Sequence, residues 1–478
     1  MDRRKIKILM LAAEASPLVK VGGLGDVVGA LPAALGALGV DTRIMLPFYG
    51  LVSPRKQKIS KVFSFEVAEG GRKEKASLWR TVLPGSRTTV YLVKHPYFRG
   101  KEIYAGGRLA KGKKYTRGQD DIRRFAFFDK AAVAALEKLD FKPDILHFHD
   151  WHTALVPDYL KRSGIRIKTV FTIHNLANQG LMDGRFFKRE NLAVLSGFPP
   201  QISQDFMARG VLNSDFITTV SPTYAREILT PEQGVGLEGV LAARRKDLRG
   251  ILNGLDTDFF DPANDPFLKK KFSAPDLGSK RDNKLELQRR FGLPRDARVA
   301  VVSLVSRLVW QKGLELITDD FADLDCQFIF LGAGEKEYEN RLKKLAKKYP
   351  DKVAARFGFD EGLAHKIYAG SDIFLMPSRF EPCGLGQMIA MRYGTVPVVR
   401  STGGLADTVD RKTGFAFKEF RAKALYHALA TAIDSFYHRP RLWKGLRAAG
   451  MRKDFSWTES AKIYLKLYQK LIRNGRFH

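Results

Sequence analysis

Cysteine, long apolar runs and acidic residues are all scarce in this sequence. Two cysteines, Cys326 and Cys383, occur among 478 residues, and there is no CxxC pair, which excludes a disulfide framework and leaves no cysteine pair to hold zinc. This usage indicates a reducing, cytoplasmic setting. No apolar run approaches the ~18 residues that span a bilayer. The apolar stretch after the basic N-terminus, residues 8–13, is shorter than the ~7–15 residues of a secretion signal, so we expect neither secretion nor a membrane anchor.

The scarcity of acidic residues leaves a large positive charge. The sequence has 81 lysines and arginines against 51 aspartates and glutamates, a formal net charge of +30. Such an excess predicts affinity for an anion: nucleic acid, a membrane surface or a phosphorylated substrate. The basic clusters are scattered, at residues 113–114, 244–246, 269–271 and 343–348. We therefore interpret them as a solvated basic surface and do not expect a nucleic-acid partner.

Short apolar runs alternate with helical patterns along almost the whole chain. The expected strands are residues 5–11, 43–48, 88–94, 145–149, 169–173, 217–220, 298–304, 326–331, 372–376 and 396–399. The expected helices include residues 24–38, 122–139, 153–160, 335–348 and 385–392. This alternation predicts an α/β fold with doubly wound, Rossmann-like domains, in which parallel sheets carry helices on both faces.

The two halves of the chain meet in a segment with little periodicity. Residues 258–284 hold several prolines and a run of three lysines, and we interpret them as the end of a linker that begins near Gly250. This predicts two domains, residues 1–250 and 251–456. Two doubly wound domains that face each other place a ligand cleft between them, at the carboxyl ends of both sheets.

The first candidate site is the glycine-rich segment 20–26 (KVGGLGD), between the first strand and the first long helix. Its glycines let backbone N–H groups approach an anion, the helix N-terminus adds a positive dipole end, and Lys20 adds a full charge. The rival interpretation is a dinucleotide site. The spacing disfavours it, because residues 14–21 separate the strand from the glycines and Gly29 comes one position too late. A plain structural turn is a further alternative.

Histidines gather at the ends of two strands in the first half. Residues 147–152 (HFHDWH) end one strand, and their three histidines and one aspartate suggest a metal. However, the first two histidines share a strand face, the other residues lie past its end, and no fourth ligand with metal-site spacing is evident. We interpret this cluster as the lining of a cleft at the strand's carboxyl end. His174, directly after the next strand, is either structural or part of the same lining.

Charged residues follow two strands of the second half. Arg307 and Lys312 are five positions apart across a turn, so both can reach one diphosphate, the arginine through paired hydrogen bonds and the lysine as a point charge. Residues 377–387 present Glu381 in a loop before a helix start, and residues 402–407 (TGGLAD) repeat a glycine-opened helix start. Phosphate would repel a carboxylate, so we assign Glu381 to neutral sugar hydroxyls. With no metal set, Ser-His-Asp order or Walker A lysine beside them, these features fit a phosphorylated sugar donor.

The combination of these motifs resembles bacterial glycogen synthases and their plant relatives, the starch synthases. The segments that carry the resemblance occur in family order: residues 20–26, 149–152, 174–175, 221–227, 252–254, Arg307 with Lys312, 378–385, 402–408 and 454–457. The resemblance implies a GT-B fold and transfer of glucose from a nucleotide donor, usually ADP-glucose in bacteria, to the 4-OH of an α-1,4-glucan end. It also implies retention of configuration, no metal or other cofactor, and a last helix, within residues 457–478, that packs back on the first domain.

The resemblance assigns roles residue by residue. His174 is expected to contact the transferred glucose, with Asp150 beside the acceptor path; Arg307 and Lys312 neutralise the leaving diphosphate, and Glu381 holds glucose hydroxyls. The remaining expected donor contacts are Lys20, Gly22, Gly23, Asp26, Asn253, Gly384, Leu385, Thr402 and Gly403. 

Three positions depart from the family's usual pattern. Gly386 stands where threonine or asparagine is usual, Val21 where many members have threonine, and Asp121 where we expect asparagine. These departures leave the nucleotide open, so a UDP-glucose-preferring synthase, or a relative with another acceptor, is the rival enzyme. A non-catalytic anion-binding protein is the alternative outside the enzymes.

Overall fold

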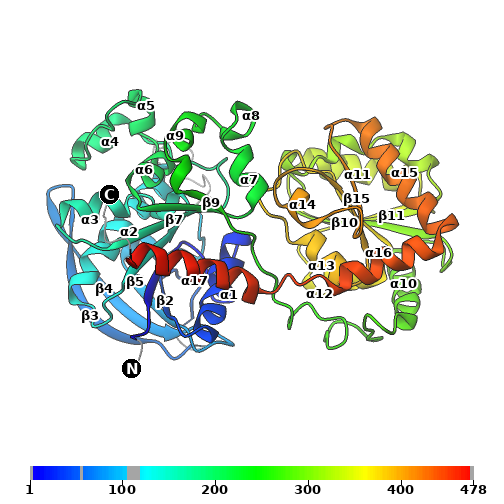
Figure 1. Cartoon of the computed structure of the whole chain (residues 1–478), viewed down its shortest axis with the longest axis horizontal. Coiled ribbons are helices and arrows are strands. Elements are labelled where there is room, and N and C mark those ends of the chain that lie inside the picture. The colour runs from blue at the N-terminus through cyan, green and yellow to red at the C-terminus, as the bar shows by residue number, and fades with distance from the viewer. Residues whose placement is uncertain (1–3, 54–56, 105–118, 474–478) are drawn as a thin grey trace. The chain divides into compact units, whose positions relative to one another are not determined.

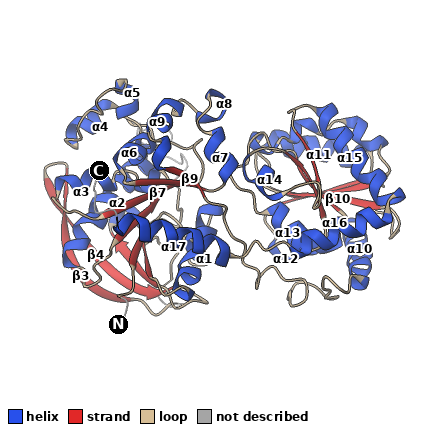
Figure 2. Ribbon diagram, in the orientation of Figure 1, coloured by secondary structure: helices blue, strands red, loops and turns tan. Residues whose placement is uncertain are grey.

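The structure is a computed structural model that describes residues 4–53, 57–104 and 119–473 (Figure 1). The basic pair at residues 113–114 lies outside the described residues. The chain forms two compact units: the first holds the chain up to Val220, Ala225–Gly254 and the C-terminal helix α17 (Trp457–Arg473), and the second holds Ser221–Tyr224 and Leu255–Ser456. In each unit helices cover a sheet (Figure 2). The predicted α/β class, with two Rossmann-like units, is confirmed. No helix in the described part of the chain is long and apolar enough to cross a membrane.

The sheet of the first unit has nine strands in the order β3-β4-β5-β2-β1-β6-β7-β8-β9. Seven of them form a parallel sheet: β1 (Lys7–Leu11), β2 (Asp41–Pro47), β5 (Thr89–Lys94), β6 (Ile145–His149), β7 (Lys168–Ile173), β8 (Phe216–Thr219) and β9 (Leu248–Gly250). All five residues of β6, His147 and His149 included, are buried, as expected for a central parallel strand covered on both faces. The strand order reverses between β1 and β6, so this is where a doubly wound sheet binds ligands, beyond the carboxyl ends of its strands.

The expected parallel sheet carries an antiparallel addition at one edge, which was not predicted. There β3 (Ser60–Glu69) and β4 (Arg72–Val82) form an antiparallel hairpin, and β4 also pairs antiparallel with β5. Gly70 and Gly71, with φ values of 55° and 79°, make the two-residue turn that matches the twist of a hairpin. The sequence signal was weak because most side chains of these edge strands are exposed and many are charged.

The long helices of the first unit are α1 (Gly23–Ala37), α2 (Gln119–Lys138) and α3 (Val156–Arg162). Shorter helices connect the later strands: α4 (Gly184–Arg189), α5 (Pro200–Ser203), α6 (Phe206–Asn213), α7 (Pro222–Glu227), α8 (Pro231–Gly234) and α9 (Glu238–Ala243). Helix α17 lies beside α1, and both pack on one face of the sheet (Figure 1). Gly254 permits this return, because a Cβ atom there would lie 2.5 Å from the Cα atom of Trp457.

The second unit has a parallel sheet in the order β12-β11-β10-β13-β14-β15, which is the doubly wound Rossmann order with its switch point between β10 and β13. The strands are β10 (Ala300–Val305), β11 (Cys326–Gly332), β12 (Val353–Phe357), β13 (Ile373–Met376), β14 (Val396–Arg400) and β15 (Phe415–Phe417). The helices are α10 (Gly278–Phe291), α11 (Lys336–Lys348), α12 (Glu361–Gly370), α13 (Gly386–Arg392), α14 (Gly403–Thr408), α15 (Ala422–His438) and α16 (Pro440–Arg452). Alternate residues of β10 join two different core clusters, so both faces of the sheet are covered.

The predicted linker 258–284 is wrong over its last residues, because α10 begins at Gly278. The buried residues of this helix are Lys280, Lys284, Leu287 and Gln288, which follow helical spacing. Two of the four are lysines, so the apolar pattern that would have indicated a helix is missing. The ammonium of Lys284 lies 2.7 Å from a carboxylate oxygen of Asp372, which compensates its burial.

Candidate functional site

The glycine-rich loop of the first unit is organised by a carboxylate that the sequence analysis did not single out. Glu14, 3% exposed, follows β1, and its Oε2 accepts hydrogen bonds from the backbone amides of Val21 and Gly22 at 2.5 and 2.9 Å. Its Oε1 accepts one from the Tyr104 hydroxyl at 2.5 Å. The Gly22 amide, which we expected to point at an anion, is therefore already bound to a carboxylate. A buried acidic residue directly after a strand was the signal that could have revealed it.

Lys20 and Asp26 lie on the solvent side of this loop. Their side chains form an ion pair at 2.7 Å and are 42% and 29% exposed. The loop approaches Glu14 closely, because a Cβ atom on Gly25 would lie 3.1 Å from the carboxylate. Gly22 and Gly23 have open space around them instead. The loop thus presents one cation beside two uncrowded glycines at the start of α1.

Asp150 and His174 come together at the carboxyl ends of β6 and β7. Asp150 has a φ of 57°, and its carboxylate accepts the His174 backbone N–H at 2.7 Å. Burial raises the pKa of Asp150 to about 7 although this hydrogen bond favours the charged form. The His174 ring contacts His149, with Nε2 3.0 Å from Nδ1, and burial lowers the pKa of His174 to about 3. His174 is therefore a neutral imidazole at physiological pH.

The other histidines of the predicted cluster, His147 and His152, are buried within the first unit. His147 is fully buried beneath α17, where Nδ1 lies 2.8 Å from the Tyr468 hydroxyl and Nε2 lies 2.6 Å from the Thr172 hydroxyl. The His152 ring packs among aromatic rings, with centroids 4.2 Å from Trp151 and 5.1 Å from Tyr104. His147 and His149 share one face of β6, with ring centroids 4.3 Å apart, but His147 lies further from the carboxyl end of the strand. Within the described ranges no group of three or more His, Cys, Asp or Glu side chains could hold a metal ion.

Asn253 lies between β9 and the start of the second unit. Its side chain is 7% exposed, and in the described part of the chain Oδ1 has no hydrogen-bond partner. A buried amide oxygen without a partner costs free energy unless a bound molecule satisfies it.

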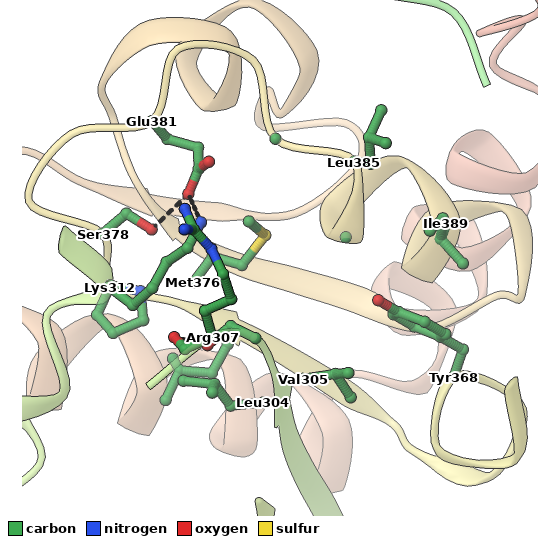
Figure 3. A pocket seen from close by; sticks show the side chains of 15 residues that line it. Leu304, Val305, Arg307, Lys312, Tyr368, Met376, Ser378, Glu381, Leu385 and Ile389 are labelled. Carbon is green, nitrogen blue, oxygen red and sulfur yellow. Dashed lines mark hydrogen bonds and ion pairs between the residues drawn. The ribbon is translucent and has the colours of Figure 1, made fainter. Parts of the chain in front are cut away.

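In the second unit, five of the predicted residues line one pocket of about 210 Å³ at the switch point: Arg307, Lys312, Glu381, Gly384 and Leu385. Thr402 and Gly403 are not among its lining residues. Lys312 comes from the loop after β10 and Glu381 from the loop after β13, and their side chains meet with Nζ 2.6 Å from Oε2. The Ser378 hydroxyl donates to the same oxygen at 2.8 Å. Figure 3 shows these three side chains, with Arg307 beside them, at one end of the pocket. Gly384 and Leu385 also line it, as the sequence analysis expected of donor contacts.

Two glycines fix the loop that carries Glu381. Gly384 has a φ of 74° and Gly403 a φ of 46°, which few other residues adopt. A Cβ atom on Gly403 would lie 1.9 Å from the carbonyl oxygen of Glu381, so the two loops touch through their backbones, and Thr402 beside them is buried. The helix expected over residues 385–392 begins one residue later, at Gly386 in α13, and α14 begins at Gly403.

A segment from the first half of the chain supports the same loops. Ser221 belongs to the second unit, and its hydroxyl donates to the carbonyl of Pro382 at 2.6 Å. The backbone N–H and hydroxyl of Thr223 donate to the Asp407 carboxylate at 2.8 and 2.7 Å. These contacts give residues 221–227, which local pattern alone did not explain, a structural role.

Comparisons with known proteins follow the same division of the chain. Residues 7–243 match the family described as starch synthase catalytic domain, and residues 287–445 match glycosyl transferases group 1. A glycogen synthase of Thermotoga maritima is 43% identical over 498 residues, covering 98% of this chain and 100% of the relative. A glycogen synthase of Geobacillus stearothermophilus is 41% identical over 497 residues, covering 98% of each chain.

Solved structures give the same fold. The catalytic domain of starch synthase IV from Arabidopsis thaliana, bound to ADP and acarbose, is 33% identical with a TM-score of 0.86, covering 98% of this chain and 100% of that one. A sucrose-phosphate synthase from Thermosynechococcus elongatus, 17% identical with a TM-score of 0.63, shares the fold alone.

Proposed function

Because this chain belongs to the family of bacterial glycogen synthases and plant starch synthases, we propose that it transfers glucose from ADP-glucose to the non-reducing 4-OH end of an α-1,4-glucan, with retention of configuration. The GT-B glycosyltransferase fold and the hexosyl transfer follow from the family. The nucleotide, the linkage and the individual residue roles are the proposal. We place the reaction in the cytoplasm, since both cysteines are buried thiols.

The observation that carries the proposal is the pairing of Lys312 with Glu381 at the polar end of the pocket. A nucleotide-sugar donor brings a diphosphate and a neutral sugar to one place, so its site needs cations and a hydroxyl acceptor close together. Lys312, 2.6 Å from Glu381, separates the carboxylate from the diphosphate and reduces their repulsion. Arg307 adds a second, exposed cation. Glu381 then accepts hydrogen bonds from glucose hydroxyls.

The proposed mechanism relies on charge stabilisation. As the bond between glucose and the diphosphate breaks, the sugar acquires oxocarbenium character and negative charge grows on the leaving group. The cations of Arg307 and Lys312 stabilise that growing charge without reorganising. Gly384, Leu385, Thr402 and Gly403 are assigned to donor contacts through their backbone groups. The transferred glucosyl group ends on the 4-OH oxygen of the acceptor, whose proton leaves with the nucleoside diphosphate.

Residues of the first unit are assigned to the transferred glucose and the acceptor. His174, neutral because burial lowers its pKa to about 3, can exchange hydrogen bonds with sugar hydroxyls without placing a charge beside a cationic sugar. Asp150 holds the His174 backbone at 2.7 Å and so fixes the position of the ring. The residues assigned to donor contacts are Lys20, Gly22, Gly23, Asp26 and Asn253. Because the Gly22 amide already donates to Glu14, the role assigned to Gly22 is the space that its missing side chain leaves for the donor.

Nucleotide release by the purified protein with glycogen, without added metal, tests the proposal. We expect ADP-glucose to be turned over faster than UDP-glucose, in keeping with the ADP bound to the Arabidopsis starch synthase. Faster release of UDP would preserve the mechanism and change the donor. Release from neither substrate by folded protein, together with salt-dependent DNA binding, would favour the non-catalytic anion-binding alternative.

A further inference from the structure

The apolar end of the second unit's pocket contains a hydroxyl group that the mechanism above does not use. Apart from the polar end, most side chains lining the pocket are apolar: Leu304, Val305, Leu375, Met376, Leu385 and Ile389. Two hydroxyl groups lie among them. The Ser306 hydroxyl donates to the backbone carbonyl of Arg307 at 3.0 Å, and the other belongs to Tyr368, in the last turn of α12 (Figure 3). In the close-up its hydroxyl oxygen points into the space between Val305 and Ile389.

The Tyr368 hydroxyl has no partner within the described ranges, although the side chain is 5% exposed. Burial alone raises its pKa, with no charged or hydrogen-bonding neighbour contributing. It therefore stays a neutral phenol that can both donate and accept a hydrogen bond. Because Tyr368 lines the pocket, a ligand bound there can exchange a hydrogen bond with this hydroxyl.

The position of Tyr368 is fixed from three sides. Its backbone carbonyl accepts hydrogen bonds from the Lys280 ammonium at 3.2 Å and the Thr395 hydroxyl at 2.6 Å. Its ring packs against Phe374, with centroids 5.0 Å apart, and against Tyr393 at 6.2 Å. The hydroxyl is thus held in place before a ligand arrives, which lowers the entropy cost of contacting it.

Gly386 makes this arrangement possible. A Cβ atom on Gly386 would lie 2.9 Å from Cε1 of Phe374 and 3.5 Å from the Met376 sulfur, so any side chain there would displace the ring that supports Tyr368. This is also the position where the sequence departs from the usual threonine or asparagine. The position of the Tyr368 ring therefore depends on the absence of a side chain at Gly386, because Phe374 packs against both.

We propose that the Tyr368 hydroxyl hydrogen bonds to the base of the sugar nucleotide and sets the preference between nucleotides. The inference rests on the proposed donor site: with cations at one end for the diphosphate, apolar walls and a fixed hydroxyl suit a flat base with a polar edge. Adenine and uracil present different donors and acceptors at that edge, so one fixed hydroxyl cannot serve both equally.

The test compares Tyr368→Phe with wild type and with Tyr426→Phe, a control on α15 whose ring packs against Phe321 in the core. Kd values are measured for ADP, UDP and inorganic pyrophosphate, together with kcat and KM for both sugar nucleotides. We expect Tyr368→Phe to weaken binding of the preferred nucleotide about three- to tenfold and to change the ADP:UDP preference. Pyrophosphate affinity and kcat should change less than about twofold, and the control should match wild type.

Two results would overturn the proposal: equal weakening of ADP, UDP and pyrophosphate, which marks a structural role, or unchanged affinity for both nucleotides. Gly386→Ala provides a second test, because crowding Phe374 should weaken nucleotide binding and leave pyrophosphate binding intact. Loss of both binding modes in a variant with wild-type Tm would contradict it. Nucleotide binding without glucan extension would defeat the proposed function and leave this inference standing, so the two failures are distinguishable.

Discussion

Replacing Lys312 by Met removes the ammonium at the polar end of the pocket and retains a side chain of similar length. The Lys312 and Glu381 side chains are 14% and 8% exposed and their charged atoms lie 2.6 Å apart, so water screens the pair little. The substitution leaves the carboxylate with the Ser378 hydroxyl at 2.8 Å. Stranding a buried charge in this way costs about 3 kcal/mol, which lowers the Tm of a unit of this size by about 6–12 °C.

The same substitution should reduce catalysis by a different route. Removing one charge that faces the leaving group should lower kcat by a factor of about 10²–10³. We expect KM for the sugar nucleotide to change only a few-fold. Steady-state kinetics with ADP-glucose and glycogen, together with thermal unfolding, measure both effects. Lys344→Met, on an exposed face of α11, is the matched control and should change neither.

A double variant separates stability from catalysis. Lys312→Met combined with Glu381→Gln no longer strands a charge, so part of the lost Tm should return. Its kcat should stay as low as that of the single variant, because the cation is still absent. An unchanged kcat with a raised KM in Lys312→Met would contradict a transition-state role for the lysine, since it would assign the side chain to ground-state binding.

Three further predictions concern the supporting structure. Burial raises the pKa of Asp150 from 3.8 to about 7, so between those pH values the folded state holds a proton that the unfolded state has lost. The free energy of unfolding of wild type, measured in urea, should therefore fall relative to that of Asp150→Asn as pH rises from 4 to 7. The same pH dependence in both proteins would contradict this. Gly403→Ala would place a methyl group 1.9 Å from a carbonyl oxygen, and it should lower the free energy of unfolding by more than about 2 kcal/mol. Gly445→Ala, in open space on α16, should raise the free energy of unfolding by about 0.5–1 kcal/mol. Tyr468→Phe removes a hydroxyl 2.8 Å from Nδ1 of His147 and should cost about 1–3 kcal/mol in chemical unfolding; no loss would mean that this contact adds nothing to the docking of α17.

The central strands could be predicted from the sequence because burial on both faces produces continuous apolar runs. Strand β6 spans the predicted residues, Ile145–His149, and the other predicted strands differ from the structure by one or two residues at their ends. The parallel strands β9, β12 and β15 were not predicted. Helix α10 was missed at its start because Lys280 and Lys284 occupy its buried positions. The β3–β4 hairpin was missed because its exposed charged faces carry little periodic signal.

The candidate site was predictable in its location and not in its contacts. Residues after strand ends indicated the loops of Lys312 and Glu381, since parallel strands end at a common edge. Their direct ion pair, and the capture of loop amides by Glu14, depend on loop conformations that local spacing does not determine. A role for Tyr368 could not be predicted, because an aromatic residue at helical spacing is usually a core residue and the sequence does not reveal the cavity beside it.

Incorporation of labelled glucose from ADP-glucose into glycogen, followed by digestion with a β-amylase, tests the central claim most directly. We expect wild-type protein to extend the glucan and the digestion to release the label as maltose. Lys312→Met should incorporate about 10²- to 10³-fold less label per unit time. Hydrolysis of ADP-glucose without incorporation, or incorporation by Lys312→Met at the wild-type rate, would contradict this claim.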